Sequence, residues 1–469
     1  MKTNNITLVG LGLLSTLFGI KQESKAANNK PNFIFILGDD MGYSDLSCYN
    51  TATIKSHNNT PNLDRMATGG MRLTDCHSNG ALSTPTRAAF LTGRYQQRAG
   101  LQGVILENNP VHLAAGLQPE EVTFAEVLKG AGYKSALFGK WHLGGMDKYN
   151  PLNQGFDKFI GFKTGNIDLQ THIDTQAKFD FWDGFSINDV SGYATEIFTT
   201  SAIDFIKENK DNPFCIYIAE SAAHGPCQGP NDGAIRQLGR TKPVHVYPAD
   251  YNQPIARKEM IEYMDKGVGQ ILDSLKTLGL DSNTLVIFMS DNGPKDYSGG
   301  FALPLKQGKG SPYEGGHRMP AVMYMPGTIL PGTVCNQTVM GMDFFPTFVE
   351  MAGINYSSIV KPLDGVSLLP LIKGEQLVPR TLYWNLGPKK AAVREGKWKL
   401  VGVMPDPIEC EALPAMEFSL FDLSKDISEK KDLASTYPDI VTSLKTKFDA
   451  WLIDVQSDVP DQLNNSDIE

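Results

Sequence analysis

The sequence has few cysteines and no pattern that would join them into a metal site or a disulfide framework. Its 469 residues contain 6 cysteines, none of them in CxxC or Cys/His zinc spacing, and scattered thiols of this kind are typical of isolated buried side chains. An excess of positive charge is also absent, because 43 Lys and Arg stand against 52 Asp and Glu, a net charge of -9. Such a chain repels polyanions in general, so we expect no nucleic-acid partner and expect any anionic substrate to be held by local cations.

Long apolar runs are missing as well, and the one notable stretch lies at the N-terminus. Lys2 is followed by an apolar segment from Ile6 to Ile20, interrupted by Gly, Ser and Thr, and then by the small pair Ala26-Ala27. This layout is typical of a signal peptide, and the segment is shorter than the roughly 18 apolar residues that a membrane anchor needs. We therefore predict a signal peptide over residues 1–26, export, and no membrane insertion of the mature chain.

The mature chain contains short buried-type strands that alternate with helical segments. Four continuous apolar runs predict strands buried on both faces, and they cover Phe33–Leu37, Ser135–Phe138, Phe214–Ala219 and Leu285–Met289. Helical periodicity lies between them over 123–131, 195–208 and 257–278. This order predicts an α/β fold with a doubly wound, mostly parallel sheet flanked by helices.

The pattern changes near residue 376. Shorter runs at 381–384, 391–403 and 418–423 precede a helical stretch over 437–455, which predicts a small antiparallel sheet with a packed helix. We expect an N-terminal α/β catalytic domain over 27–375 and a smaller C-terminal α+β subdomain over 376–469.

Polar clusters follow each of the four predicted strands. They are Gly38-Asp39-Asp40, Gly139-Lys140-Trp141-His142, the segment from Glu220 to His224, and Ser290-Asp291-Asn292. Each cluster alone is as consistent with a helix cap or a surface turn. In open α/β sheets ligands bind beyond the carboxyl ends of the strands, so four such clusters together predict one site.

Oxygen ligands dominate this predicted site. Asp39, Asp40, Asp291 and Asn292 supply carboxylate and amide oxygens, which favour a hard cation, calcium above magnesium, whereas zinc prefers nitrogen or sulfur.

A serine stands at the predicted start of a helix after residue 80. The run Ser83-Thr84-Pro85-Thr86-Arg87 ends at Gly93, and we expect Thr84 as N-cap, Pro85 as the first helical residue and Gly93 as the stop. An anion is favoured near such a helix start, and Arg87 lies one turn into the helix. Capping alone would also explain this pattern.

These residues resemble the signature of the type I sulfatases, in which Cys or Ser is followed by any residue, Pro, any residue and Arg, and then by Leu-Thr-Gly. The resemblance extends through residues 132–144, 291–294, 308–316 and 420–423, so it covers about 31–435. It implies an alkaline-phosphatase-like fold and the hydrolysis of sulfate esters.

The resemblance also implies roles for the individual residues. Ser83 would act after conversion to formylglycine, and the serine form implies a bacterial chain matured by a Ser-type radical enzyme. One calcium ion would be held by Asp39, Asp40, Ser83, Asp291 and Asn292. Arg87, Lys140 and Lys309 would supply fixed positive charge, His224 with Lys309 would be the acid for the leaving group, and His142 the base, with the two histidine roles open to exchange.

Two other functions remain open from the sequence. One is a phosphomonoesterase or phosphodiesterase of the same superfamily with unmodified Ser83, and the other is an inactive carbohydrate-binding or sensor protein. We expect a sulfated glycan as substrate and a periplasmic location, because the resemblance and the signal peptide suit glycan degradation. The sequence leaves the sugar, the sulfate position and the oligomeric state undetermined.

Substrate-binding residues are expected in two segments. The first, 164–172, is polar and is followed by the aromatic stretch 179–183, which predicts contacts with sugar hydroxyls and ring faces. A solvated loop above a small aromatic core is an equally good interpretation. Asp168 and His172 are the candidates there, and His317 and Arg318, close to Lys309 in sequence, are the candidates in the second segment.

Overall fold

The computed structural model describes Met1 and residues 30–242, 245–295, 300–355, 361–405, 414–456 and 462–463. The predicted signal peptide therefore lies outside the described residues, apart from Met1. Among the residues described, no helix has both the length and the apolar character to cross a membrane. Cys48, Cys76, Cys215, Cys227 and Cys335 are free thiols, as the sequence predicts.

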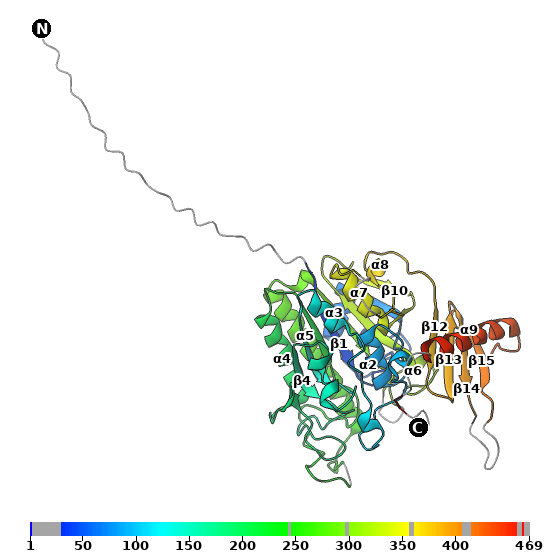
Figure 1. Cartoon of the computed structure of the whole chain (residues 1–469), viewed down its shortest axis with the longest axis horizontal. Helices are drawn as coiled ribbons and strands as arrows, with labels where there is room; N and C mark the ends of the chain where they lie inside the picture. Colours follow the sequence, from blue (N-terminus) through cyan, green and yellow to red (C-terminus); the bar gives the residue numbers. More distant parts are fainter. Residues whose placement is uncertain are drawn as a thin grey trace.

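One large mixed sheet forms the centre of the molecule (Figure 1). Its strands run in the order β10 (Thr333–Cys335), β2 (Met71–His77), β9 (Arg318–Tyr324), β8 (Thr284–Ser290), β1 (Asn32–Gly38), β7 (Phe214–Ala219), β3 (Lys134–Lys140), β4 (Lys158–Phe162), β5 (Trp182–Asp183) and β6 (Ser186–Ile187), with β11 (Val339–Met340) paired to β2. The central strands β8, β1, β7, β3 and β4 are parallel, whereas β9 runs antiparallel between β8 and β2. The α/β prediction and the four predicted strands are confirmed.

Helices cover both faces of this sheet. Apolar residues of α1 (Pro61–Gly69), α4 (Ala194–Glu208) and α5 (Gln253–Thr277) share one core, and those of α2 (Ser83–Thr92), α3 (Phe124–Gly130), α7 (Phe344–Met351) and α8 (Leu369–Ile372) share the other. Successive residues of β1 alternate between the two cores: Phe33 and Phe35 belong to one, Ile34 and Ile36 to the other. Such a strand has no polar face, which explains its continuous apolar run.

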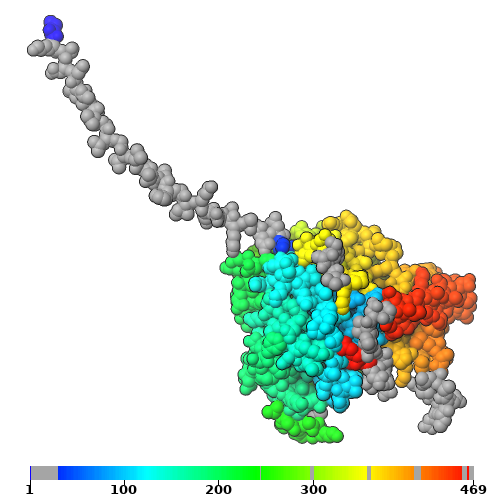
Figure 2. Space-filling view, viewed as in Figure 1, coloured from blue at the N-terminus to red at the C-terminus, as the bar shows by residue number. Residues whose placement is uncertain are grey.

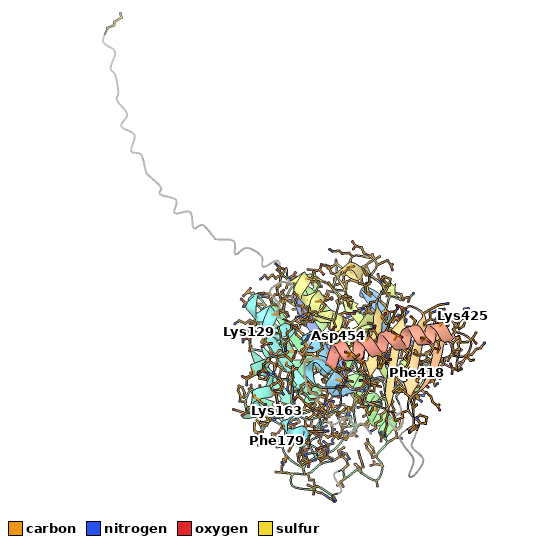
Figure 3. The ribbon with its side chains drawn as sticks, turned by 45° about the vertical axis from the view of Figure 1, so that its right-hand side comes forward. Lys129, Lys163, Phe179, Phe418, Lys425 and Asp454 are labelled. Atoms are coloured by element: carbon orange, nitrogen blue, oxygen red, sulfur yellow. The ribbon has the colours of Figure 1, made fainter. Side chains whose placement is uncertain are left out.

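A second sheet carries the C-terminal helix. Its antiparallel strands are β12 (Thr381–Asn385), β13 (Lys390–Glu395), β14 (Trp398–Val403) and β15 (Glu417–Asp422), and α9 (Pro438–Gln456) lies across them (Figure 3). The expected change at 375–376 falls between α8 and β12. In the space-filling view this orange and red unit packs directly against the main body (Figure 2).

Polar and apolar contacts join the two sheets. Tyr95, Met340 and Met342 share a core with the C-terminal strands, and the indole N–H of Trp384 donates to the Ser78 carbonyl at 2.8 Å. Asp454, labelled near one end of α9 in Figure 3, pairs with Arg98 at 2.5 Å. The C-terminal unit is thus attached close to α2, the helix that begins with Ser83.

Candidate active site

The carboxyl ends of the parallel strands bring the predicted polar clusters together. Asp39 and Asp40 follow β1, Lys140 ends β3, and Asp291 and Asn292 follow β8. The glycine before Lys140 allows β3 to lie this close to β7. Gly139 has a φ of +113°, and a Cβ there would lie 2.0 Å from the Ala219 carbonyl of β7. The segment after β7 joins them through His224, whose Nε2 lies 3.8 Å from Asp40 Oδ2. The convergence predicted from the four strand ends is confirmed.

Ser83 lies at the first position of α2, in contact with three of these residues. Its hydroxyl is 3.3 Å from Asp39 Oδ1, 3.4 Å from Asn292 Oδ1 and 3.3 Å from Lys140 Nζ. The helix starts two residues earlier than expected: Leu82 is the N-cap, without a side-chain bond, and Gly93 in the left-handed conformation ends the helix. Instead of capping α2, the Thr84 hydroxyl donates to the His142 carbonyl at 3.1 Å.

Each carboxylate of the cluster has a cationic neighbour. Lys140 Nζ lies 2.5 Å from Asp39, and Lys309 Nζ lies 2.5 Å from Asp40. Arg87, fully buried, reaches Asp291 at 3.1 Å and Asp39 at 3.6 Å. The second terminal nitrogen of Arg87 donates to the Lys140 carbonyl at 3.2 Å and to the Tyr217 hydroxyl at 3.3 Å.

These contacts set the charge of the cluster. Burial raises the pKa of Asp39 and of Asp40, but Lys140 beside the first and Lys309 beside the second outweigh it, so both pKa values lie below the ordinary one. Burial and the neighbouring Asp39 raise the pKa of Asp291. Burial lowers the pKa of Lys140, although Asp39 opposes it.

His142 is buried and held as a neutral imidazole. Burial, with Lys140 nearby, keeps its pKa well below the ordinary value. Its Nε2 lies 2.9 Å from the Ile105 carbonyl; because a carbonyl can only accept, Nε2 carries the proton. The lone pair therefore lies on Nδ1, which is buried and has no partner among the described residues.

His224 occupies the more open side of the cluster. Its side chain is 21% exposed, and its Nε2 lies 3.8 Å from Asp40 Oδ2. Its Nδ1 meets the Gly225 carbonyl at 2.5 Å, so Nδ1 is the donor and Nε2 faces Asp40. Burial and the charge of Lys309 lower the pKa of His224.

The oxygens around Ser83 suit an oxygen-ligated cation. The single hydroxyl proton of Ser83 cannot satisfy both Asp39 Oδ1 and Asn292 Oδ1, so acceptor oxygens face one another with no proton between them. A hard cation stabilises such an arrangement, and carboxylate, amide and hydroxyl oxygens are ligands it prefers. The donor set therefore fits a metal ion.

Two of the predicted substrate-binding residues are used inside the protein. Asp168 is fully buried, and its carboxylate accepts backbone N–H groups from Gln170, Thr171, Ile235 and Arg236. His172 is 1% exposed, stacks on Phe181 with ring centroids 4.2 Å apart, and meets the Gly192 carbonyl with Nε2. The expectation that they contact substrate is corrected, because their polar groups organise the loop instead.

The other two belong to a buried charged cluster between the two sheets. His317 is fully buried and stacks on Trp384 at 4.1 Å, and Arg318 pairs with Asp75 and Glu314. The expectation of substrate contact at His317 and Arg318 is corrected for the same reason. His77, Glu314 and His317 lie close enough to share a metal ion, but Lys399 Nζ already lies 2.9 Å from Glu314 and 3.1 Å from His317.

A cavity of about 420 Å³ opens beside the site. Its lining includes Asp40, His224, Asn166, Arg236, His245 and Lys295. Asn166 falls in the polar segment expected to bind sugar. No local pattern marked Arg236 or His245, which lie in a polar stretch without periodicity.

The class of protein that this geometry suits is a hydrolase of anionic esters, because a serine hydroxyl, oxygens that fit a cation and fixed positive charge surround one position. Comparison with known proteins agrees. Residues 31–354 match the Sulfatase family, and residues 308–454 match the C-terminal part of N-sulphoglucosamine sulphohydrolase.

Individual relatives cover most of the chain. It is 33% identical to N-acetylgalactosamine-6-sulfatase of Canis lupus familiaris, over 83% of this chain and 75% of the relative. It is 30% identical to arylsulfatase A of Bos taurus, over 91% of this chain and 89% of the relative. The solved structure of Ps i-CgsB superposes with a TM-score of 0.78 at 27% identity, covering 93% of this chain and 96% of that one.

The chain therefore belongs to the sulfatase family, and it is an enzyme that hydrolyses sulfate esters. The fold and the activity implied by the sequence resemblance are confirmed.

Proposed function

We propose that this enzyme removes sulfate from sulfated glycans or their mono- and oligosaccharide fragments, with formylglycine made from Ser83 and one bound calcium ion. The observation that carries the proposal is the contact of Ser83 with Asp39, Asn292 and Lys140 at 3.3–3.4 Å. The glycan substrate is supported by two relatives: one is named for N-acetylgalactosamine 6-sulfate, and the Ps i-CgsB structure was also solved with k-i-k-neocarrahexaose.

Calcium would be held by Asp39, Asp40, Asp291, Asn292 and the modified Ser83. Bound there, it would supply positive charge to a sulfate oxygen and would lower the pKa of the aldehyde hydrate of formylglycine. Lys140 and Lys309 already pair with Asp39 and Asp40, so the protein's own cations balance part of the negative charge. Arg87 bridges Asp291 and Asp39 and fixes the spacing of those two ligands.

The two histidines have different surroundings, which supports different roles. His224 lines the open cavity next to Lys309, on the side where a leaving sugar would extend. We assign it the proton donation to the leaving oxygen; because Nδ1 donates to the Gly225 carbonyl, His224 does this through Nε2, as the imidazolium. His142 is buried and neutral with its Nδ1 lone pair unused. We assign it the proton abstraction that regenerates the aldehyde.

Other functions are less well supported. A phosphatase of this superfamily would use unmodified Ser83 and further metal ligands at the site. The other group of possible metal ligands, at His77, Glu314 and His317, already contains the ammonium of Lys399, so it does not supply a second metal site. An inactive binding protein would have no reason to keep Lys140, Arg87 and both histidines around Ser83.

Export to the periplasm and maturation by a Ser-type radical enzyme complete the proposal. The experiment is to produce the chain with and without such a maturase and to assay sulfate release from an aryl sulfate and from sulfated disaccharides. Activity that depends on the maturase supports the proposal. Equal activity without it, or hydrolysis of phosphate esters alone, would favour the phosphatase.

A further inference from the structure

The cavity beside the site is continuous with the catalytic residues. Its lining runs from Asp40 and His224 to Asn166, Arg236 and His245. A sugar whose sulfate lies at Asp40 and His224 would therefore extend toward the last three residues, and their chemistry bears on which sugars fit.

Arg236 is exceptional among the buried arginines. Each of the others pairs with a carboxylate: Arg87 with Asp291, Arg94 with Glu121, Arg257 with Asp45, Arg318 with Glu314 and Arg394 with Asp75. Arg236 is 2% exposed, yet no carboxylate in the described part of the chain forms an ion pair with it. Burial lowers the pKa of Arg236 to about 10, the opposite of the other buried arginines whose pKa is shifted.

Asp168, Asp174 and Glu107 raise the pKa of Arg236 through space, but together they do not outweigh its burial. Asp168 directs one carboxylate oxygen to the backbone N–H groups of Ile235 and Arg236, at 2.7 and 2.9 Å, and the other to the N–H groups of its own loop. The carboxylate thus fixes the backbone of Arg236, while the guanidinium makes no ion pair with any carboxylate that the structure describes. A buried charge in that state strongly favours an incoming anion.

The guanidinium also orients two neighbours. It donates to Asn166 Oδ1 and, at 2.9 Å, to His245 Nε2, and to the carbonyls of Asn166 and Ile173. Because arginine can only donate, Asn166 must present its oxygen and His245 its Nε2 lone pair. The amide NH₂ of Asn166 and the Nδ1–H of neutral His245 are then left as donors, and no acceptor for them is found in the described chain.

We infer that Arg236, Asn166 and His245 form a subsite for a second anionic group on the substrate, a carboxylate or a further sulfate next to the sulfate that is cleaved. Asn166 and His245 donate hydrogen bonds to it, and Arg236 supplies the positive charge and holds both donors in place. This inference rests on the proposed glycan sulfatase function. It narrows the substrate class to glycans that carry a uronate or a second sulfate near the scissile ester.

The test compares three disaccharides that share one scissile sulfate. In the first the other positions are neutral, in the second the neighbouring sugar is a uronate, and in the third a second sulfate is present. For the matured enzyme we expect kcat/KM to be about 10- to 100-fold higher for at least one anionic substrate, mainly through KM, as the loss of a charged hydrogen bond would predict. The uronate and disulfate arms show which anion is preferred.

Variants distinguish loss of the Arg236 charge from a general loss of folding or activity. Arg236→Gln should bring the ratio of anionic to neutral kcat/KM close to one, and His245→Ala should lower it. His245 lies on a more exposed segment, so His245→Ala tests the subsite if Arg236→Gln does not fold. The matched control is Arg240→Gln, because Arg240 is exposed, lies outside the cavity lining and should leave the ratio unchanged.

The outcomes distinguish this inference from the function on which it rests. Equal kcat/KM for all three disaccharides, or a preference that persists in both Arg236→Gln and His245→Ala, would refute the anionic subsite while sulfatase activity stands. If matured protein hydrolyses neither the disaccharides nor a small aryl sulfate, the proposed function itself fails. A binding measurement accompanies the kinetics. In calorimetry, the unmatured protein should bind the preferred anionic disaccharide more tightly than the neutral one.

Discussion

Replacing Arg87 by lysine keeps the charge at the centre of the site and removes the planar fork. The two terminal nitrogens of Arg87 make four contacts, to Asp291, Asp39, the Lys140 carbonyl and the Tyr217 hydroxyl, at 3.1–3.6 Å. A single ammonium cannot span all four groups from one position.

The magnitude follows from the groups left unpaired. If the new lysine still pairs with Asp39 and Asp291, the buried Lys140 carbonyl and Tyr217 hydroxyl lose their hydrogen-bond donor. Each loss costs about 1–3 kcal/mol. We expect a loss of about 2–6 kcal/mol in the free energy of unfolding, hence a fall in Tm of about 2–6 °C for a chain of this size. Since the same fork sets the spacing of Asp39 and Asp291, kcat should fall by about 10²–10³, the range seen when a fixed transition-state donor is lost.

Thermal melts and initial rates on one sulfated substrate measure both effects. Arg94→Lys is the matched control: Arg94 is buried and pairs with Glu121 at 3.0 Å just beyond α2, so its conservative replacement should leave kcat unchanged. If Arg87→Lys melts like the wild type and keeps kcat within about threefold, the account of the fork is wrong.

The remaining predictions concern metal, pH and the contact between the two sheets. A calcium chelator should abolish turnover and lower Tm, and added calcium should restore both, whereas full activity in excess chelator would remove the metal assignment. Burial raises the pKa of Glu220 to about 8, so the folded state holds a proton that the unfolded state loses above its ordinary pKa. Stability should therefore fall from about pH 4.5 to pH 8, by roughly 5 kcal/mol in all. Glu220→Gln should remove that decline and raise Tm at pH 9, and parallel pH profiles for variant and wild type would contradict the assignment. Lys399→Met should lower the free energy of unfolding by about 3–5 kcal/mol, because Lys399 is buried between Glu314 and Glu429 at 2.9 Å each. Urea unfolding measures this, and an unchanged midpoint would show that this cluster does not hold the two sheets together.

The strands and the core of the site were predictable because their signals are local. Each buried strand is a continuous apolar run followed by its polar cluster, and parallel topology alone brings the ends of β1, β3 and β8 together. Ser83, Arg87 and Lys140 therefore meet as the sequence indicated. Only the fold reveals Tyr217 as a partner of Arg87 and the Ile105 carbonyl as the partner of His142.

The substrate-binding residues were not predictable in this way. A polar residue in a polar segment carries no sign of its burial, so Asp168 and His317 were chosen for chemistry that the fold uses internally. The partner of His317 is Trp384, which is distant in sequence. The residues around Arg236 in sequence form no motif. What distinguishes Arg236 is that it is buried without an ion pair to any carboxylate of the described segments, and only the packed structure reveals this.

The central claim is that Ser83 acts as formylglycine. The most direct test measures the mass of the peptide that carries Ser83 together with the sulfatase activity of the same protein sample. The account predicts a loss of two hydrogens from that peptide in protein made with a Ser-type maturase, sulfate release in proportion to the converted fraction, and no activity for Ser83→Ala. A peptide of unmodified mass in fully active protein would contradict it.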